Sequence, residues 1–316
     1  MLSRRTFVGA SAIAALAGFT GAPALAEIPN EIRIGYQKNG VLVVARQQAV
    51  LEKHFAPSGI AISWIDFPSG PPMLEAMNAG SVDFGQVGDT PPIFAEAAGA
   101  RIVYVAGQPI TNGQGILVKP DSAIRALADL KSKRVGFTKG SSAHNVVVMA
   151  LEKAGLQYTD ITPVYLSPPD GAAAFARDAI DAWAVWDPFF AIGETRGGGR
   201  VLVNANEIGK TNSFYIANRD FAQRSPQVVS AVIDVLVKTA EWAEAHRDLV
   251  GRVLAEVTGV DLDIQTKAAQ RSSFAIGKLT DDIVATQQAV ADRFFRLGLI
   301  PRQIVVREAV WTASQS

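Results

Sequence analysis

The sequence predicts an α/β fold made of two lobes. The first observation is an internal repeat: residues 34–38 (Ile-Gly-Tyr-Gln-Lys) resemble 135–139 (Val-Gly-Phe-Thr-Lys), and 81–89 resemble 179–187 in the same order. The second is that each segment reads as a strand, a short polar loop and then a helical pattern. Strands that alternate with helices predict mainly parallel sheets covered on both faces. The alternative is that any two α/β segments share this general pattern.

Acidic residues before prolines mark two helix starts, and this is the third observation. Asp89 precedes Pro91, and Asp187 precedes Pro188. An acidic N-cap followed by proline in the first turn is typical of helix N-termini. Each of these helices is therefore expected to begin directly after a strand of the repeat.

The order of the elements sets the expected lobe boundaries. Residues 27–117 together with 218–316 are expected to form lobe 1, and residues 118–217 to form lobe 2. Long helical patterns over 225–246 and 281–297 are expected to pack on lobe 1. The chain would then cross between the lobes at about residues 118 and 217. Two crossing strands make a hinge, which allows the lobes to close around a ligand.

Composition excludes several classes of function. Hydrophobic residues make up 48% of the 316 residues, charged residues make up 19%, and the formal net charge is zero. These values are typical of a globular protein and do not indicate nucleic acid or an anionic membrane as a partner. The chain has no cysteine, which excludes a thiolate nucleophile, a cysteine metal site and a lipidated cysteine anchor. Its three histidines are scattered, so we expect no metal, no cofactor, and a monomer without a membrane anchor.

Residues 1–26 have the layout of a secretory signal peptide. Arg4 and Arg5 precede an uncharged Ala/Gly-rich stretch, and Ala24-Leu25-Ala26 forms a small-x-small cleavage site. The alternative is a transmembrane anchor, but the stretch is weakly hydrophobic and is interrupted by glycine and proline. The arginine pair also resembles a twin-arginine signal, with the general secretory route as the alternative. We therefore expect an exported protein.

Four polar loops follow the repeated strands, and open α/β sheets bind ligands beyond the carboxyl ends of their strands. If the lobes face each other, four helix N-termini converge on one cleft. A helix N-terminus presents unpaired N–H groups and the positive end of the helix dipole, so it can bind an anion without a charged side chain. The donors in these loops are Gln37, Thr90, Ser141, Ser142, His144 and Asn145. The sequence therefore predicts a site for a small anion with several oxygens.

Trp186 is the expected apolar wall of this site. It ends the strand over 182–185, at the position that Gly88 holds in the other lobe. Gly88 would let the backbone approach the ligand, Trp186 would cover the ligand's carbon part, and Phe214 is a further candidate contact. The alternative is that Trp186 is a core residue like Trp183. We favour ligand contact, because side chains three apart on a strand point to opposite faces.

Charged residues near the loops allow more than one interpretation. Asp89 and Asp187 would repel an anion if they faced it, so we favour a role as N-caps that turns each carboxylate onto its own helix. Lys38 and Lys139 occupy matched positions and would either attract the anion or remain solvated. His144, one turn into a helix, would either bond the anion or cap the helix start.

Four motifs together resemble the aliphatic sulfonate-binding proteins of ABC importers. They are residues 35–38 (Gly-Tyr-Gln-Lys), 87–95 (Val-Gly-Asp-Thr-Pro-Pro-Ile-Phe-Ala), 139–145 (Lys-Gly-Ser-Ser-Ala-His-Asn) and 183–189 (Trp-Ala-Val-Trp-Asp-Pro-Phe). The similarity extends over essentially the whole chain after the N-terminal segment. It implies the type II periplasmic binding protein fold, a sulfonate group held between the lobes, and delivery of the ligand in the periplasm to the permease subunits of an ABC importer.

The resemblance implies, by position, a ligand site lined by Gln37, Gly88, Thr90, Ser141, Ser142, His144, Asn145 and Trp186. The other candidate ligand-binding residues are Asp89, Asp187 and Phe214. Ala143 departs from the pattern, because close relatives are expected to carry a third small polar residue there. No catalytic residue is expected.

Two alternatives to an alkyl sulfonate remain. Relatives that bind taurine, nitrate or thiamine precursors share the fold, and Asp187 beside Trp186 could hold the ammonium group of taurine. A desulfinase also resembles these binding proteins, but its chemistry needs a cysteine nucleophile that this chain lacks. A Ser141–His144–Asp187 arrangement has no nucleophile-elbow motif to support it, so an enzyme is not expected.

Overall fold

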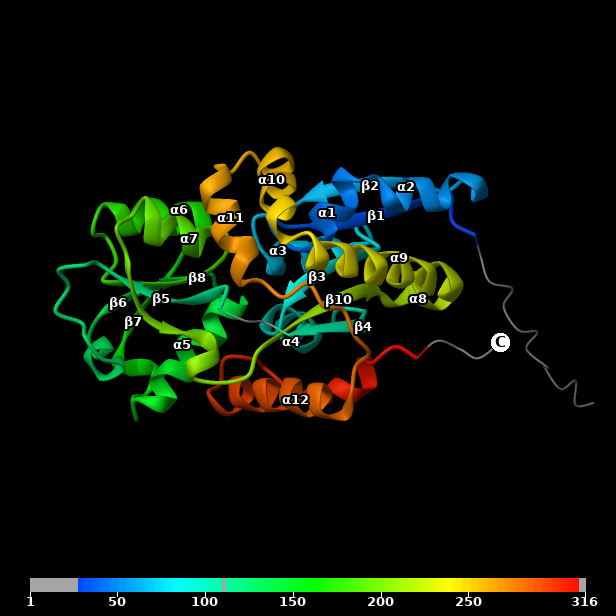
Figure 1. The fold of residues 1–316 in the computed structure, drawn as a ribbon. Helices are drawn as coiled ribbons and strands as arrows, with labels where there is room; N and C mark the ends of the chain where they lie inside the picture. Colours follow the sequence, from blue (N-terminus) through cyan, green and yellow to red (C-terminus); the bar gives the residue numbers. More distant parts are fainter. Residues whose placement is uncertain (1–27, 110–111, 313–316) are drawn as a thin grey trace, which may run out of the picture.

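Two five-stranded sheets form the two lobes of the protein. The structure is a computed structural model that describes residues 28–109 and 112–312 (Figure 1). The first sheet has the order β2-β1-β3-β10-β4, with β1 (Glu31–Tyr36), β2 (Ala61–Asp66), β3 (Phe84–Gly88), β4 (Ile102–Pro109) and β10 (Asn212–Asn218). The second has the order β7-β6-β8-β5-β9, with β5 (Gln114–Val118), β6 (Arg134–Phe137), β7 (Thr162–Tyr165), β8 (Ala182–Trp186) and β9 (Arg200–Asn204).

The two sheets share one topology. Strand β1 is parallel to β2 and β3, and β6 is likewise parallel to β7 and β8. Strands β10 and β5 run antiparallel to both of their neighbours, each at the fourth position of its sheet. The predicted two-lobed α/β fold and its internal repeat are therefore confirmed.

Helices cover both faces of each sheet. On the first sheet, one face is covered by α1 (Val41–Gln47), α2 (Val50–Phe55), α8 (Arg219–Arg224), α9 (Pro226–Ala245) and α10 (Arg247–Thr258), and the other by α3 (Gly70–Asn78), α4 (Thr90–Ala97) and α12 (Asp281–Arg296). On the second sheet, α5 (Ser142–Lys153) covers one face, and α6 (Pro168–Ala176) and α7 (Phe189–Thr195) cover the other. The long helices expected over 225–246 and 281–297 correspond to α9 and α12, and both pack on the first lobe as predicted.

The crossing points differ from those expected at residues 118 and 217. Strand β5 lies in the second sheet and β10 lies in the first, so the chain changes lobes between Pro109 and Gln114 and again between Asn204 and Asn212. The expected boundaries lie near the far ends of β5 and β10. In the structure both strands have already entered the receiving lobe, where their backbone groups pair with strands on both sides.

The fold brings two sets of strand ends together. Helices α1 and α4 begin just after β1 and β3 in the first lobe, and α5 and α7 begin just after β6 and β8 in the second. Helix α11 (Leu262–Arg271) follows α10 in the first lobe and packs against α7 of the second (Figure 1). The carboxyl ends of the parallel strands therefore face one another across the junction of the lobes.

No helix within residues 28–109 and 112–312 is long and apolar enough to cross a membrane. The predicted signal peptide, residues 1–26, lies outside the described residues.

Candidate functional site

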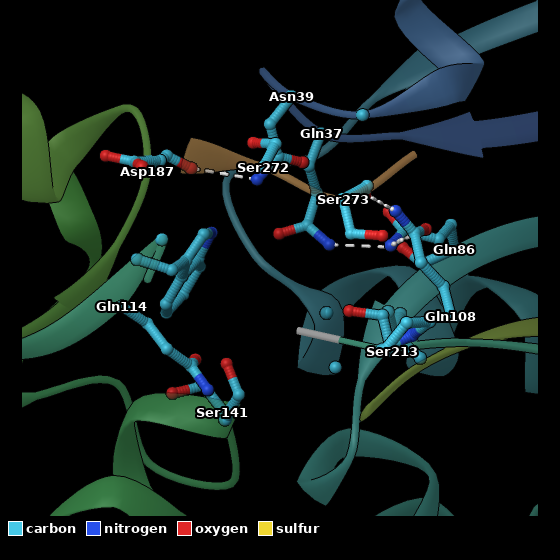
Figure 2. A pocket seen from close by; sticks show the side chains of 18 of the residues that line it. Gln37, Asn39, Gln86, Gln108, Gln114, Ser141, Asp187, Ser213, Ser272 and Ser273 are labelled. Carbon is cyan, nitrogen blue, oxygen red and sulfur yellow. Dashed lines mark hydrogen bonds between the residues drawn. The ribbon is translucent and has the colours of Figure 1, made fainter. Parts of the chain in front are cut away.

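A pocket with a cavity volume of about 100 Å³ lies between the two lobes. The starts of α1, α4, α5 and α7 all reach its wall, as predicted, through Gly40, Pro91, Ser142 and Asp187. Figure 2 shows Asp187, Gln114 and Ser141 of the second lobe facing Gln37, Gln86, Gln108 and Ser213 of the first. The pocket is therefore a feature of the closed lobes, because neither lobe alone supplies both walls.

Side-chain amides form the wall on the first lobe. The Gln37 Nε2 donates to the backbone carbonyl of Gln86 at 3.2 Å, and the Gln86 Nε2 lies 3.5 Å from the Gln108 Oε1. Gln108 in turn donates to the carbonyl of Ser273 and accepts from the Tyr215 hydroxyl at 3.4 Å. This chain of bonds holds three neutral amides at the pocket surface, where each keeps polar atoms for a ligand.

Serine and glutamine form the polar wall on the second lobe. Ser141 is the N-cap of α5, and its Oγ donates to the carbonyl of Thr138 at 2.7 Å. Ser142 begins the helix, and the His144 N–H donates to the Ser141 carbonyl at 3.0 Å, so the N–H groups of Ser142 and Ala143 are the ones without a partner within the helix. The buried Gln114 donates to the Thr211 Oγ1 at 3.3 Å. The Ser142 hydroxyl and the helix start are therefore the donors on this wall, because Ser141 directs both its hydroxyl proton and its backbone N–H to the carbonyl of Thr138.

Trp186 forms an apolar part of the pocket wall. It ends β8 opposite Gln114 in the β-ladder and is half-buried. Trp183, three residues earlier, is 1% exposed and packs against the ring of Phe175 at 5.8 Å between centroids. The two tryptophans therefore have the different environments that strand alternation predicts.

Asp187 faces the pocket but is already neutralised. Its carboxylate accepts two bonds from Arg271 of α11, at 2.7 Å from Nε and 2.6 Å from Nη2, and a third from the Ala191 backbone N–H at 3.0 Å. The bond from Ala191 turns the carboxylate onto the first turn of α7, as predicted, although the N-cap residue itself is Pro188. The ion pair with Arg271 was not predicted, and it joins the two lobes. Burial raises the pKa of Asp187, and Arg271 opposes that shift.

The pocket has no excess of positive charge. Among the described residues that line it, Asp187 alone is ionisable, and Arg271 neutralises it. The two matched lysines are directed elsewhere: the Lys38 ammonium donates to the carbonyl of Thr258 at 3.1 Å, and Lys139 lies over the ring of Tyr165. An anion in this pocket would therefore be held by neutral donors and helix dipoles.

Comparison with known proteins shows the family. A sequence profile of the NMT1-like family matches residues 26–257. The solved structure of the alkanesulfonate-binding protein SsuA from Xanthomonas axonopodis pv. citri, bound to MOPS, is 40% identical. That match covers 90% of this chain and 99% of the other, with a TM-score of 0.86. This chain belongs to the family of aliphatic sulfonate-binding proteins.

A second solved structure supports this assignment, and two other matches are less similar. The periplasmic aliphatic sulphonate binding protein SsuA of Escherichia coli is 38% identical, over 92% of this chain and 94% of the other, with a TM-score of 0.82. A taurine-binding periplasmic protein of Escherichia coli (strain K12) is 30% identical, but over only 55% of each chain. The desulfurization enzyme DSZB shares the fold at 19% identity and a TM-score of 0.63. The relatives with high identity are binding proteins, whereas the enzyme is a distant match that shows the fold alone.

Gly88 brings the lobes of this sulfonate-binding family member into direct contact. A Cβ atom added to Gly88 would lie 2.7 Å from the Cβ of Ser142 across the pocket. Real Cβ atoms essentially never approach that closely, so a larger residue would force the lobes apart. The expected role was close approach of the backbone to a ligand. The structure shows in addition a close approach of one lobe to the other.

Asp89, Thr90 and Asn145 lie beside the pocket and do not line it. The Asp89 carboxylate accepts from the Thr90 Oγ1 at 2.9 Å and from the Asn145 Nδ2 at 2.7 Å. Asp89 is the N-cap residue of α4, as predicted, but its side chain makes no cap bond to the helix, so that part of the prediction is wrong. Burial raises its pKa to about 6. The Asn145 Oδ1 accepts from Arg293 of α12 at 3.1 Å, so this network joins α4 and α12 to α5.

His144 is a neutral core residue between the lobes. Its ring stacks on Phe137 and meets Phe294 edge-on, each at 4.9 Å between centroids, and its Nε2 lies 2.9 Å from the Tyr158 hydroxyl. Burial lowers the pKa of His144 to about 3. The structure therefore corrects the expectation of a ligand donor: α5 turns this ring away from the pocket. Phe214 is corrected in the same way, because it packs against Tyr104 in the first lobe's core.

The structure adds polar pocket residues that the sequence did not indicate. They are Asn39, Gln86, Gln108, Gln114, Ser213, Ser272 and Ser273. The available signal was a neutral polar residue inside an otherwise apolar strand, as at Gln86 and Gln108. The two serines after α11 carry no local signal, because only tertiary packing brings them to the pocket. Within the described part of the chain, no group of three His, Cys, Asp or Glu side chains could hold a metal ion.

Proposed function

We propose that the pocket between the lobes binds an aliphatic sulfonate and that closure of the lobes over it presents the ligand to the permease subunits of an ABC importer. The observation that carries the proposal is the combination of a donor-rich pocket without a free cation and an apolar wall at Trp186. A sulfonate has three oxygens to accept hydrogen bonds and a carbon tail to cover, so it uses both walls.

The energies are sufficient for tight binding. Each hydrogen bond to the charged group contributes roughly 1.5–3 kcal/mol, and a micromolar Kd requires about 8 kcal/mol in total. After the costs of ordering and desolvation, about four to six such bonds with some apolar contact supply that amount. We assign the donors to Gln37, Ser142 and the start of α5, with Gly88 and Trp186 shaping the pocket. Ser141 joins them when its hydroxyl turns from the Thr138 carbonyl to the ligand.

The state of Asp187 favours an alkyl tail over the ammonium of taurine. Its carboxylate already accepts two bonds from Arg271 and one from the backbone of Ala191. An ammonium group would have to compete with a buried guanidinium for these oxygens. Taurine is therefore the second ligand to test, and we expect it to bind more weakly than ethanesulfonate.

Export and assembly complete the proposal. We assign residues 1–26 to a cleaved signal that delivers a monomer, without an anchor, to the periplasm, and the Arg4–Arg5 pair fits the twin-arginine route. Replacing both arginines by lysine tests the route, because folded export through the twin-arginine pathway would stop while general secretion would continue.

A thermal-shift screen of the protein without residues 1–26 tests the function. The ligands are methane-, ethane- and butanesulfonate, taurine, sulfate and nitrate. A ligand at about a hundred times its Kd stabilises the fold by about 2.7 kcal/mol. We expect shifts with the alkyl sulfonates and none with sulfate. A shift with nitrate alone would contradict the proposal.

A variant tests the assigned apolar wall. Trp186→Ala should weaken butanesulfonate more than methanesulfonate, because the indole covers the tail. Equal losses for both ligands would show that it does not.

A further inference from the structure

A buried glutamine of α11 holds the loop that follows β1. Gln265 is 0% exposed, and its Nε2 donates to the backbone carbonyl of Lys38 at 3.1 Å and to the Thr258 Oγ1 at 3.0 Å. The Thr258 hydroxyl gives its own proton to the carbonyl of Leu254, so both neighbours of the amide nitrogen are acceptors. These two acceptors fix the orientation of the amide, with its nitrogen toward Lys38.

The bond to the Lys38 carbonyl also sets the direction of the next residue. This carbonyl belongs to the peptide unit that joins Lys38 to Asn39, and a peptide unit is planar. The Lys38 ammonium donates to the backbone carbonyl of Thr258 at 3.1 Å, so Lys38 is held at two points by the end of α10 and by α11. The backbone that carries Asn39 is therefore held from outside the pocket.

The side chain of Asn39 crosses from one lobe to the other. Asn39 lies between β1 and α1 in the first lobe, and its Nδ2 donates to the backbone carbonyl of Asp187 in the second lobe at 2.8 Å (Figure 2). Both residues line the pocket. Because the two ends of this bond belong to different lobes, it forms only when the lobes are closed.

The oxygen of the Gln265 amide indicates that this residue serves more than stability. Among the described residues, the Gln265 Oε1 is a buried acceptor without a hydrogen-bond partner. Such an atom destabilises a fold, because the bonds that it gives up to water are not replaced. Methionine has a similar length and would fill the same space without an unpaired oxygen. A buried polar group that breaks this rule is typical of a functional region.

We propose that Gln265 is a positioning residue for closure: it holds the peptide between Lys38 and Asn39 so that Asn39 meets the Asp187 carbonyl as the lobes close over the ligand. Gln265 does not line the pocket and acts through Asn39. The inference rests on the proposed function, because closure over a bound sulfonate is the event that this bond stabilises.

Isothermal titration of Gln265→Met with ethanesulfonate tests the inference. We expect the Kd to rise about tenfold, because the Asn39 side chain is no longer directed at Asp187. Gln288→Met is the matched control, since Gln288 lies on α12, does not line the pocket, and has partners for both its amide nitrogen and its oxygen. This control should lower the unfolding midpoint and leave the Kd within about twofold.

A double-mutant cycle distinguishes positioning from a general structural role. Asn39→Ala alone should raise the Kd about tenfold, and adding Gln265→Met to it should raise the Kd by less than about twofold more. The two losses do not add, because both substitutions remove the same bond between the lobes. Gln265→Leu repeats the cycle with a differently shaped side chain, so that the result does not depend on how one variant folds.

Two results would overturn the inference. One is a Gln265→Met Kd equal to that of the unaltered protein. The other is additivity, a loss of about a hundredfold in the variant that combines Asn39→Ala with Gln265→Met or Gln265→Leu. Failure of the unaltered protein to bind any sulfonate would instead refute the proposed function.

Discussion

Two contacts join the lobes on either side of the pocket, and they differ in chemistry. The ionic contact joins α7 to α11 through Asp187, Glu194, Lys267 and Arg271, with Arg271 bridging both acids. The aromatic contact joins α4 and α12 to α5 through Phe94, His144 and Phe294. Figure 1 shows α11 beside α7 in the upper part of the view, and α4, α5 and α12 in the lower part.

The comparison separates two requirements for closure. The ionic contact depends on charge balance, because it buries the Asp187 carboxylate that lines the pocket. The aromatic contact depends on shape, because neutral rings and Gly88 set how closely the lobes approach. Closure of the pocket therefore requires paired charges at the ionic contact and complementary shapes at the aromatic contact. A substitution can remove either requirement without the other.

Removing the charge partner should have the largest effect. With Arg271→Met, closing the lobes over an unpaired Asp187 carboxylate costs about 3 kcal/mol, so the Kd for ethanesulfonate should rise about a hundredfold. The double variant Arg271→Met/Asp187→Asn should recover most of the affinity, because the buried charge is gone. Calorimetric titration of both variants with ethanesulfonate measures the two Kd values. An equal loss of affinity in the single and the double variant would contradict a role of Arg271 based on charge.

Filling the contact between the lobes should have the next largest effect. Gly88→Ala places a methyl group against Ser142 only in the closed form, and overpacking of this kind costs about 2 kcal/mol. The apparent Kd should rise about thirtyfold while the unfolding midpoint without ligand stays nearly constant. Gly277→Ala is the control, because a Cβ there meets nothing within 4 Å. An equal loss in the control would remove the steric explanation.

His144 should give the aromatic contact a pH dependence of its own. Because burial lowers the pKa of His144 to about 3, the unfolded chain takes up a proton below pH 6.5 that the folded protein does not. The stability is fully present above pH 6.5 and is lost as the pH falls toward 3. Between pH 6.5 and 5.5 the loss is about 1 kcal/mol.

Urea unfolding at these two pH values measures this contribution. His144→Phe should reduce the fall in unfolding free energy between pH 6.5 and 5.5 by about 1 kcal/mol. His54→Phe, at an exposed position on α2, should leave the fall unchanged. Identical pH dependence in the His144 variant and the unaltered protein would show that His144 is not held neutral.

Exposed ion pairs between the lobes should matter least. Arg296 of α12 pairs with Glu152 of α5 at 3.0 Å, but its side chain is 65% exposed. Arg296→Gln should change stability and ligand affinity by less than about 0.5 kcal/mol, because water screens such pairs. Titration at low and high salt measures this effect. A tenfold change in Kd would mean that surface charge controls closure.

The sequence predicted what depends on local pattern and missed what depends on packing. Ser141, Ser142 and Trp186 were predicted as pocket residues because a few neighbouring residues are enough to indicate a strand end or a helix start. His144 lies in the same motif, yet no local signal says which side of α5 faces the pocket. Arg271 reaches Asp187 only because α11 returns from the far end of the chain to pack on α7.

The crossing points have a consequence for the modular architecture of the chain. All five strands of the second sheet lie within residues 114–204, whereas the first sheet takes strands from both sides of that segment. Pro109 and Asn212, which flank it, are partners in the ladder between β4 and β10. One lobe is thus an uninterrupted insert whose two attachment points are neighbours, so a tight turn could replace it, or a homologous insert could be exchanged for it, without breaking a strand of the host.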